Sequence, residues 1–135
     1  MKRAILAFVV SLVIYTVSNF VIHAVLLQPL YQQTPQLLRA PQDGAAHMPF
    51  LLLSFVIFTV PFVWIYGRGV EPKGWLGQGL RYGMAIWLIA TVARYLTYFA
   101  IQPWSATVVA AQVGLELIAT LLLSLVLAAI YRKPA

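Results

Sequence analysis

Residues 78–131 read QGLRYGMAIWLIATVARYLTYFAIQPWSATVVAAQVGLELIATLLLSLVLAAIY, and this stretch decides the fold. It consists of two long apolar runs separated by a Gln-Pro-Trp turn at residues 102–104. Each run carries one charged residue far from its ends, Arg94 in the first and Glu116 in the second. A charged side chain near the centre of a lone membrane helix costs about 2.5–3.5 kcal/mol on insertion scales. We therefore expect both side chains to face a partner or a wet cavity rather than lipid.

Arg94 and Glu116 are expected to pair with each other across two antiparallel helices. Measured from the turn, Arg94 lies roughly 10 Å deep and Glu116 roughly 18 Å deep, at 1.5 Å per residue. Helical side chains lean toward the N-terminus of their own helix, so Arg94 leans deeper and Glu116 leans back toward the turn. Water or another subunit would supply the partner for each charge if this pair did not form.

The whole chain has the composition of a membrane protein. Of its 135 residues, 62% are hydrophobic and 9% are charged, which lies far outside the soluble range. Four apolar runs are near or above the roughly 18–20 residues that cross a bilayer, and they lack the strict alternation of barrel strands. We predict one membrane domain, residues 1–135, that forms an all-α bundle of four transmembrane helices. The predicted helices are residues 4–27, 49–66, 79–101 and 104–131, with an outer loop at 28–48.

Basic residues fall mainly on one side of the predicted membrane. The net charge is +6, and with the N-terminus in the cytoplasm only Arg39 lies outside, while Arg94 lies within the membrane. The basic residues on the inner side are Lys2, Arg3, Arg68, Lys73, Arg81, Arg132 and Lys133. This positive-inside distribution predicts a multi-pass protein of the bacterial inner membrane with both termini in the cytoplasm. The positive net charge is therefore explained by membrane orientation and by attraction to anionic lipid head groups, and not by binding of nucleic acid.

The two ends of the first predicted helix indicate whether it is cleaved as a signal peptide and what kind of loop follows it. The Met-Lys-Arg start resembles a signal peptide, but the apolar run is too long and lacks a small-x-small cleavage site. We therefore expect it to remain as a spanning helix. In the outer loop that follows, Thr34-Pro35 predicts a cap and first turn of a short helical segment. That loop is either a simple covered connection or a lid.

Polar residues recur on one face of several predicted helices. The first helix carries Ser11, Tyr15, Ser18, Asn19 and His23, and the fourth carries Gln112, Glu116, Thr120 and Ser124. Their inner members converge at similar depth and define a candidate ligand or ion-pair cluster of Asn19, His23, Arg94, Tyr98, Gln112 and Glu116. One histidine and one glutamate are too few for a zinc site, and no nucleophile elbow supports a catalytic triad. We expect no metal, no cofactor and no catalytic residue.

Small residues at four-residue spacing predict close helix packing. Gly79 and Gly83 form a G-x-x-x-G pattern at the start of the third helix, where another backbone can approach. Ala106, Ala110 and Gly114 form a small-residue ridge beside the polar stripe of the fourth helix. Together, the ridge and the stripe place the fourth helix inside the bundle.

Several segments of the chain resemble a known group of proteins. NFVIHAVLL at residues 19–27, the following Leu30-Tyr31, and GQGLRYG at residues 77–83 are similar to a widespread uncharacterised family of small four-helix bacterial inner-membrane proteins. The resemblance covers most of the chain and implies the four-helix architecture; the family has no assigned activity. With a single intramembrane glutamate, the chain also resembles the small multidrug transporters. Those proteins carry the carboxylate in their first helix, whereas here it lies in the fourth.

Two functions are compatible with these features. The first is a non-enzymatic integral membrane protein, an accessory or structural subunit that contacts a membrane-protein partner or a second copy of itself. The absence of a cofactor motif and the close-packing ridges favour it. The alternative is a small transporter or binder of an amphiphilic or anionic molecule at the Arg94/Glu116 cluster.

Overall fold

The computed structural model describes residues 2–132, and all of their regular structure is helical. α1 (Lys2–Asn19) continues as a π-helical segment, η1 (Phe20–Leu26). α2 (Gln28–Tyr31) and a 3₁₀ turn, η2 (Pro35–Leu37), lead to α3 (Pro41–Arg68). α4 (Trp75–Trp87), the π-helical η3 (Leu88–Val92) and α5 (Ala93–Ile101) form one continuous helix. α6 (Ala106–Tyr131) completes the described chain.

Four of these helical stretches are long and apolar enough to cross a membrane. They are Lys2–Leu26, Pro41–Arg68, Trp75–Ile101 and Ala106–Tyr131. The prediction of an all-α protein with four candidate spanning helices is therefore confirmed. Large apolar side chains cover the outer surface of all four, as expected for helices that face hydrocarbon.

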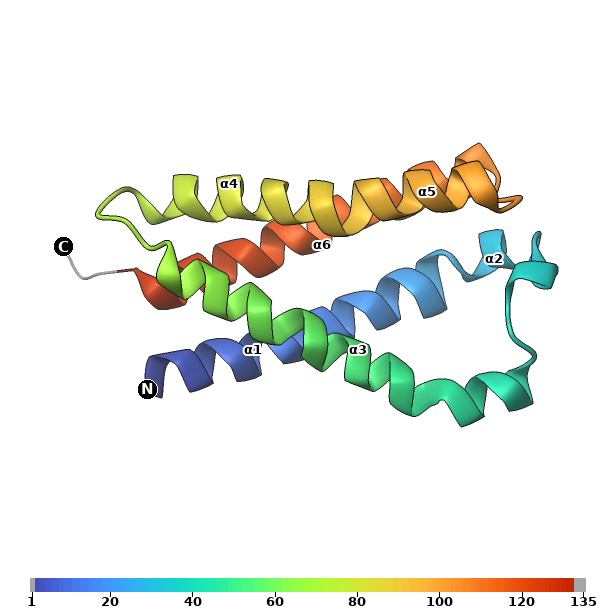
Figure 1. Cartoon of the computed structure of the whole chain (residues 1–135), viewed down its shortest axis with the longest axis horizontal. Coiled ribbons are helices and arrows are strands. Elements are labelled where there is room, and N and C mark those ends of the chain that lie inside the picture. Colours follow the sequence, from blue (N-terminus) through green and yellow to red (C-terminus); the bar gives the residue numbers. More distant parts are fainter. Residues whose placement is uncertain (1, 133–135) are drawn as a thin grey trace.

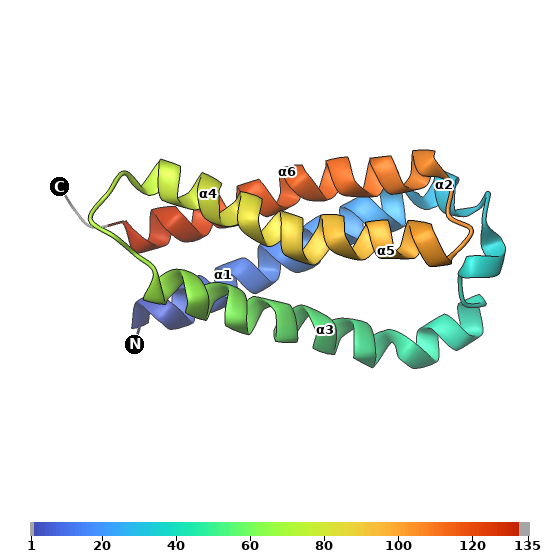
Figure 2. The same ribbon diagram turned by 45° about the horizontal axis from the view of Figure 1, so that its top comes forward.

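The helices run up and down between two ends of the bundle (Figure 1). The start of α1, the α3–α4 connection and the end of α6 lie at one end, and α2, η2 and the α5–α6 turn lie at the other. α6 packs against α4, α5 and α1, whereas α3 packs mainly on α1. Toward the α2 end, α3 diverges from its neighbours in both views (Figure 2). The largest buried apolar cluster, which includes Ala7, Phe62 and Leu127, joins α1, α3 and α6.

The described basic residues gather at the end of the bundle where α1 begins and α6 ends. This end carries Lys2 and Arg3 of α1, Arg68 at the end of α3, Lys73 and Arg81 around the α3–α4 connection, and Arg132 after α6. Lys133 lies outside the described residues. Arg39 lies at the opposite end, where its Nη1 is 2.6 Å from Oδ2 of Asp43.

The predicted outer loop is wrong over its last third, because α3 begins at Pro41 and not at residue 49. Pro41 occupies the first turn, where a missing N–H costs nothing, and Asp43 in that turn favours the positive end of the helix. The helix then runs through both Pro49 and Pro61. Thr34 makes no side-chain cap either; its hydroxyl instead lies 3.5 Å from the carbonyl oxygen of Tyr31.

Close packing between α4 and α6 depends on two glycines. Both Gly79 and Gly83 are buried against α6. A Cβ atom on Gly79 would lie 2.9 Å from Cβ of Ala128, and one on Gly83 would overlap the hydroxyl of Ser124. The structure thus brings the G-x-x-x-G pattern against the backbone of α6.

The small-residue ridge of α6 lies elsewhere than expected. Ala106, Ala110 and Gly114 are all exposed, and a Cβ on Gly114 would meet nothing within 4 Å. These three residues therefore take no part in helix packing within the described chain, although α6 itself packs against α4, α5 and α1. Ala110 and Gly114 each lie two positions from Gln112, which is a rotation of about 200° around the helix. The polar stripe faces α1, α4 and α5, so the ridge points outward on nearly the opposite side of α6.

Candidate functional site: a carboxylate cluster inside the bundle

The Glu116 carboxylate on α6 is surrounded by donors from the neighbouring helices. Thr91 donates to Oε2 at 2.7 Å and Tyr95 donates to Oε1 at 2.6 Å. Nη2 of Arg94 lies 3.3 Å from Oε2, and Nε2 of His23 lies 3.3 Å from Oε1. A carboxylate offers about four acceptor positions, so these four side chains fill it. We call Glu116, Thr91, Arg94, Tyr95 and His23 the carboxylate cluster.

A hydrogen-bonded chain extends from the carboxylate cluster toward the α2 end. Nδ1 of His23 lies 2.6 Å from the hydroxyl of Tyr31, which accepts from Nε2 of Gln112 at 2.9 Å. Nε2 of His23 faces Glu116 at 3.3 Å, and because a carboxylate can only accept, a proton on this nitrogen would donate to it. With the ring proton on Nε2, Nδ1 accepts the Tyr31 O–H. Oε1 of Gln112 is buried and has no hydrogen-bond partner within the described residues.

Burial differs sharply between the two charged partners. The Glu116 side chain is 13% exposed, whereas the Arg94 side chain is 44% exposed. The guanidinium lies over the ring of Tyr95, 4.9 Å from its centroid, which adds a cation–π contact. One part of the guanidinium therefore faces Glu116, and the rest faces out of the bundle.

Both π-helical segments supply residues of the carboxylate cluster. η1 contains His23 and η3 contains Thr91. The buried residues of the third helix include Gly79, Gly83, Thr91 and Tyr95, all separated by multiples of four. At 100° per residue, a regular α-helix would turn Tyr95 about 160° away from Gly79. The extra residue in the π turn removes about 100° of that rotation, so the two ends of the helix face α6 together.

The structure brings together four of the six predicted site residues. Arg94, Glu116, His23 and Gln112 are joined by the contacts above. Asn19 lines the small cavity beside Arg94 and Glu116, but its amide donates within its own helix, to the carbonyl of Tyr15 at 2.9 Å. Tyr98 contacts the cluster only through the ring of Tyr95, with centroids 6.2 Å apart. Tyr98 therefore lies outside the carboxylate cluster.

No family model, curated protein or solved structure matches this chain. The resemblance to a family of small bacterial inner-membrane proteins therefore stays a prediction. The function of the carboxylate cluster has to be inferred from its own geometry.

Three residues of the site were missed by the sequence interpretation. Thr91 and Tyr95 lie on the face of the third helix that carries Arg94, and their four-residue spacing was a usable signal. Tyr31 gave no such signal, because the approach of α2 to Gln112 joins residues far apart in the sequence.

The cavity beside the carboxylate cluster is small. It has a volume of about 40 Å³ and is lined by residues of all four long helices, Arg94 and Glu116 among them. A water molecule occupies about 30 Å³ in the liquid, so this space accommodates a single water rather than a substrate. Within residues 2–132, no three histidine, aspartate or glutamate side chains are grouped to hold a metal ion. The carboxylate cluster can hold the helices in position relative to one another and can stabilise the charges of Glu116 and Arg94 inside the bundle.

Proposed function

We propose that the protein is a non-enzymatic integral membrane protein that acts by contact, as an accessory or structural subunit of a larger membrane assembly. The observation that carries this proposal is the closure of the carboxylate cluster. All four acceptor positions of Glu116 are taken by side chains of the same chain, and the adjoining cavity holds about one water. A cluster of this kind stabilises helix contacts and leaves no room for a substrate at the carboxylate.

The outward side of Arg94 supports a partner within the membrane. Arg94 lies seven residues before the end of α5 at Ile101, about 10 Å below that end of the bundle. Its guanidinium has five N–H donors, and Glu116 uses only part of them. Because unsatisfied donors are expensive in hydrocarbon, an acceptor from another membrane protein or a second copy would complete this site.

The exposed face of α6 supports the same proposal. Ala106, Ala110 and Gly114 are exposed on that face, and a Cβ on Gly114 would meet nothing within 4 Å. Small residues at this spacing let two membrane helices approach closely. A partner helix that packs there would bury a surface that the chain itself leaves open.

A second candidate function is the lateral capture of an amphiphilic molecule. Where α3 diverges from α1, a cavity of about 350 Å³ opens between them. It is almost entirely apolar, with Asn19 and His23 at its polar side. A molecule that entered from the lipid could reach the far side of the carboxylate cluster through His23.

Purification in mild detergent from native membranes tests these two proposals. If the chain is a subunit, another membrane protein should co-purify at fixed stoichiometry, and Gly114→Leu should reduce its recovery severalfold. Gly44→Leu is the matched control, because Gly44 is also helical and a Cβ there meets nothing within 4 Å. A Gly114→Leu variant that retains the same companion would contradict an interface on this face. Recovery of the chain with a small amphiphile and no companion would favour the second candidate.

We also propose that both termini lie in the cytoplasm of a bacterial cell. The support is the charge distribution, since of the described lysines and arginines only Arg39 lies at the α2 end of the bundle. Reporter fusions at Ala135 and after Arg39 test this orientation. We expect cytoplasmic signal from the first and extracytoplasmic signal from the second. Cytoplasmic signal from the fusion after Arg39 would overturn the topology.

A further inference from the structure

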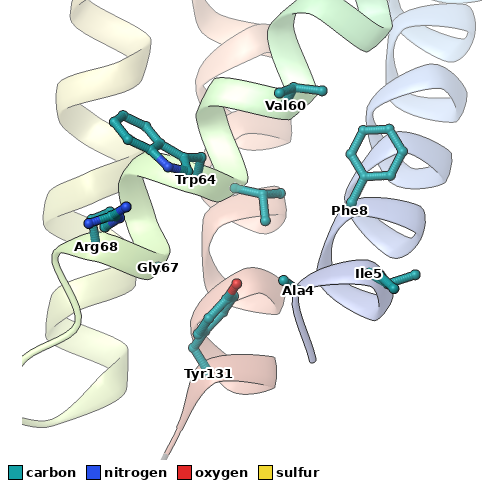
Figure 3. Close-up of a pocket in the computed structure, with 9 residues that line it drawn as sticks. Ala4, Ile5, Phe8, Val60, Trp64, Gly67, Arg68 and Tyr131 are labelled. Carbon is teal, nitrogen blue, oxygen red and sulfur yellow. The ribbon is translucent and has the colours of Figure 1, made fainter. Parts of the chain in front are cut away.

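A groove between α1, α3 and α6 opens on the surface of the bundle at its basic end. It has a volume of about 550 Å³, within the range of small-molecule sites. Ala4, Ile5 and Phe8 of α1 lie across from Val60 and Trp64 of α3, and Tyr131 of α6 lies between them (Figure 3). The lining is therefore apolar along most of its length.

The polar groups of the groove are confined to its outer end. Arg68 is in the last turn of α3, and its guanidinium lies 5.5 Å from the centroid of the Trp64 ring. The hydroxyl of Tyr131 reaches the same end because Gly67 has no side chain; a Cβ there would lie 3.1 Å from that oxygen. The groove thus has an apolar body with a cation and a hydroxyl donor at its mouth.

The length of the groove fits one leaflet of a bilayer. Val60 and Arg68 are eight residues apart on one helix, which corresponds to about 12 Å. The hydrocarbon of a single leaflet is about 15 Å thick, half of a 30 Å core. An acyl chain beside Phe8 and Val60 would place its head group at the level of Arg68.

Charge selects among the amphiphiles that this shape could hold. Lys2, Arg3 and Arg132 lie at the same end of the bundle as Arg68. The one described acidic residue there, Glu71, is paired with Lys73 at 2.6 Å, and this lysine also lowers the pKa of the Glu71 carboxyl. The net field at the mouth of the groove is therefore positive, and basic pockets of this kind attract anionic head groups.

We propose that the groove is a binding site for an anionic phospholipid. One acyl chain lies along the apolar surface between α1 and α3, and the phosphate accepts hydrogen bonds from Arg68 and Tyr131. This site is separate from the carboxylate cluster and does not depend on a protein partner.

Lipid titration of the detergent-purified chain tests the proposal. Phosphatidylglycerol and phosphatidylcholine are added separately. Native mass spectrometry counts the bound lipid, and the thermal unfolding midpoint is measured on the same samples. We expect phosphatidylglycerol to bind in preference and to raise the midpoint more. Arg68→Gln should weaken phosphatidylglycerol binding by about tenfold, the effect of losing one charge-assisted hydrogen bond. Arg39→Gln, an exposed arginine at the opposite end, should leave it unchanged.

Two further arms separate the lipid from other occupants. Ala4→Phe fills the groove without removing a cation, and it should reduce the binding of phosphatidylglycerol as strongly as Arg68→Gln does. Inorganic phosphate should not reproduce the shift in the unfolding midpoint. Equal binding of the two lipids by the unaltered chain would overturn the proposal. So would a loss with Arg39→Gln as large as with Arg68→Gln, unimpaired binding by Ala4→Phe, or a full shift with phosphate alone.

Discussion

Glu116→Leu should destabilise the protein more than the removal of any one of the four donors around it. The substitution leaves Arg94, His23, Thr91 and Tyr95 without their common acceptor. Breaking a buried charge pair from one side typically costs about 3–5 kcal/mol, because the other partner stays unpaired. Thermal unfolding in detergent, followed by circular dichroism, should show the midpoint falling by many degrees.

Removal of the other charged partner, by Arg94→Leu, should reduce stability less than Glu116→Leu does. Arg94→Leu removes a half-exposed donor, and Glu116 keeps the hydrogen bonds from Thr91 and Tyr95 and its contact with His23. The two charges are therefore unequal partners. Adding Arg94→Leu to Glu116→Leu should recover only part of the lost stability, since the Thr91 and Tyr95 hydroxyls still lack an acceptor. Thr91→Val and Tyr95→Phe added to that double variant should recover most of the rest.

Glu71→Gln is the matched control for the loss of a carboxylate. Glu71 pairs with Lys73 in an exposed loop, where solvent screens the ion pair and it contributes little to stability. Its unfolding midpoint should stay close to that of the unaltered chain. If Arg94→Leu and Glu116→Leu proved equally damaging and their effects simply added, the unequal sharing of Glu116 among its donors would be refuted.

Gly79→Ala should destabilise the packing of α4 against α6. The new Cβ would lie 2.9 Å from Cβ of Ala128 and 3.2 Å from the backbone oxygen of Ser124. Neither atom can rotate away, so α4 has to move off α6. Overpacking of this kind costs about 1–3 kcal/mol. The same thermal unfolding measurement should show the loss.

A second substitution tests whether contact with α6 causes the loss of stability in Gly79→Ala. Ala128→Gly removes the nearest obstructing atom, so Gly79→Ala combined with Ala128→Gly should be more stable than Gly79→Ala alone. Gly114→Ala is the control, because its Cβ would meet nothing within 4 Å. A Gly114→Ala variant as unstable as Gly79→Ala would show that loss of glycine, and not contact with α6, causes the effect.

Much of the fold follows from the apolar runs of the sequence. Four runs of spanning length predict four helices, because only helices and closed barrels satisfy the backbone in hydrocarbon. The ends of the helices were less certain. A proline suits the first turn of a helix, so Pro49 favours a helix start at residue 49, yet α3 runs through this proline. Residues on its N-terminal side, such as Pro41 and Asp43, make an equally good start.

The pairing of Arg94 with Glu116 could be predicted because the high cost of a lone charge in lipid demands a partner. The identity of the remaining donors could not be predicted from a regular helix face. Tyr98 follows Arg94 by four residues on the regular α5, yet it reaches only the ring of Tyr95 and not the carboxylate. The contact of Tyr31 with Gln112 depends on where α2 folds back, which the local sequence of α2 does not encode.

The π turn at Leu88–Val92 also determines where the chain tolerates a change of length. A π turn accommodates one residue more than an α turn without rotating the helix on either side. Loss of one residue within this segment would restore a regular α-helix, and Gly79 and Tyr95 would still face α6. Loss of one residue between Gly79 and Gly83 would instead rotate one glycine by about 100° away from α6. Chains of this architecture that differ by one residue in their third helix are therefore expected to carry the difference at η3.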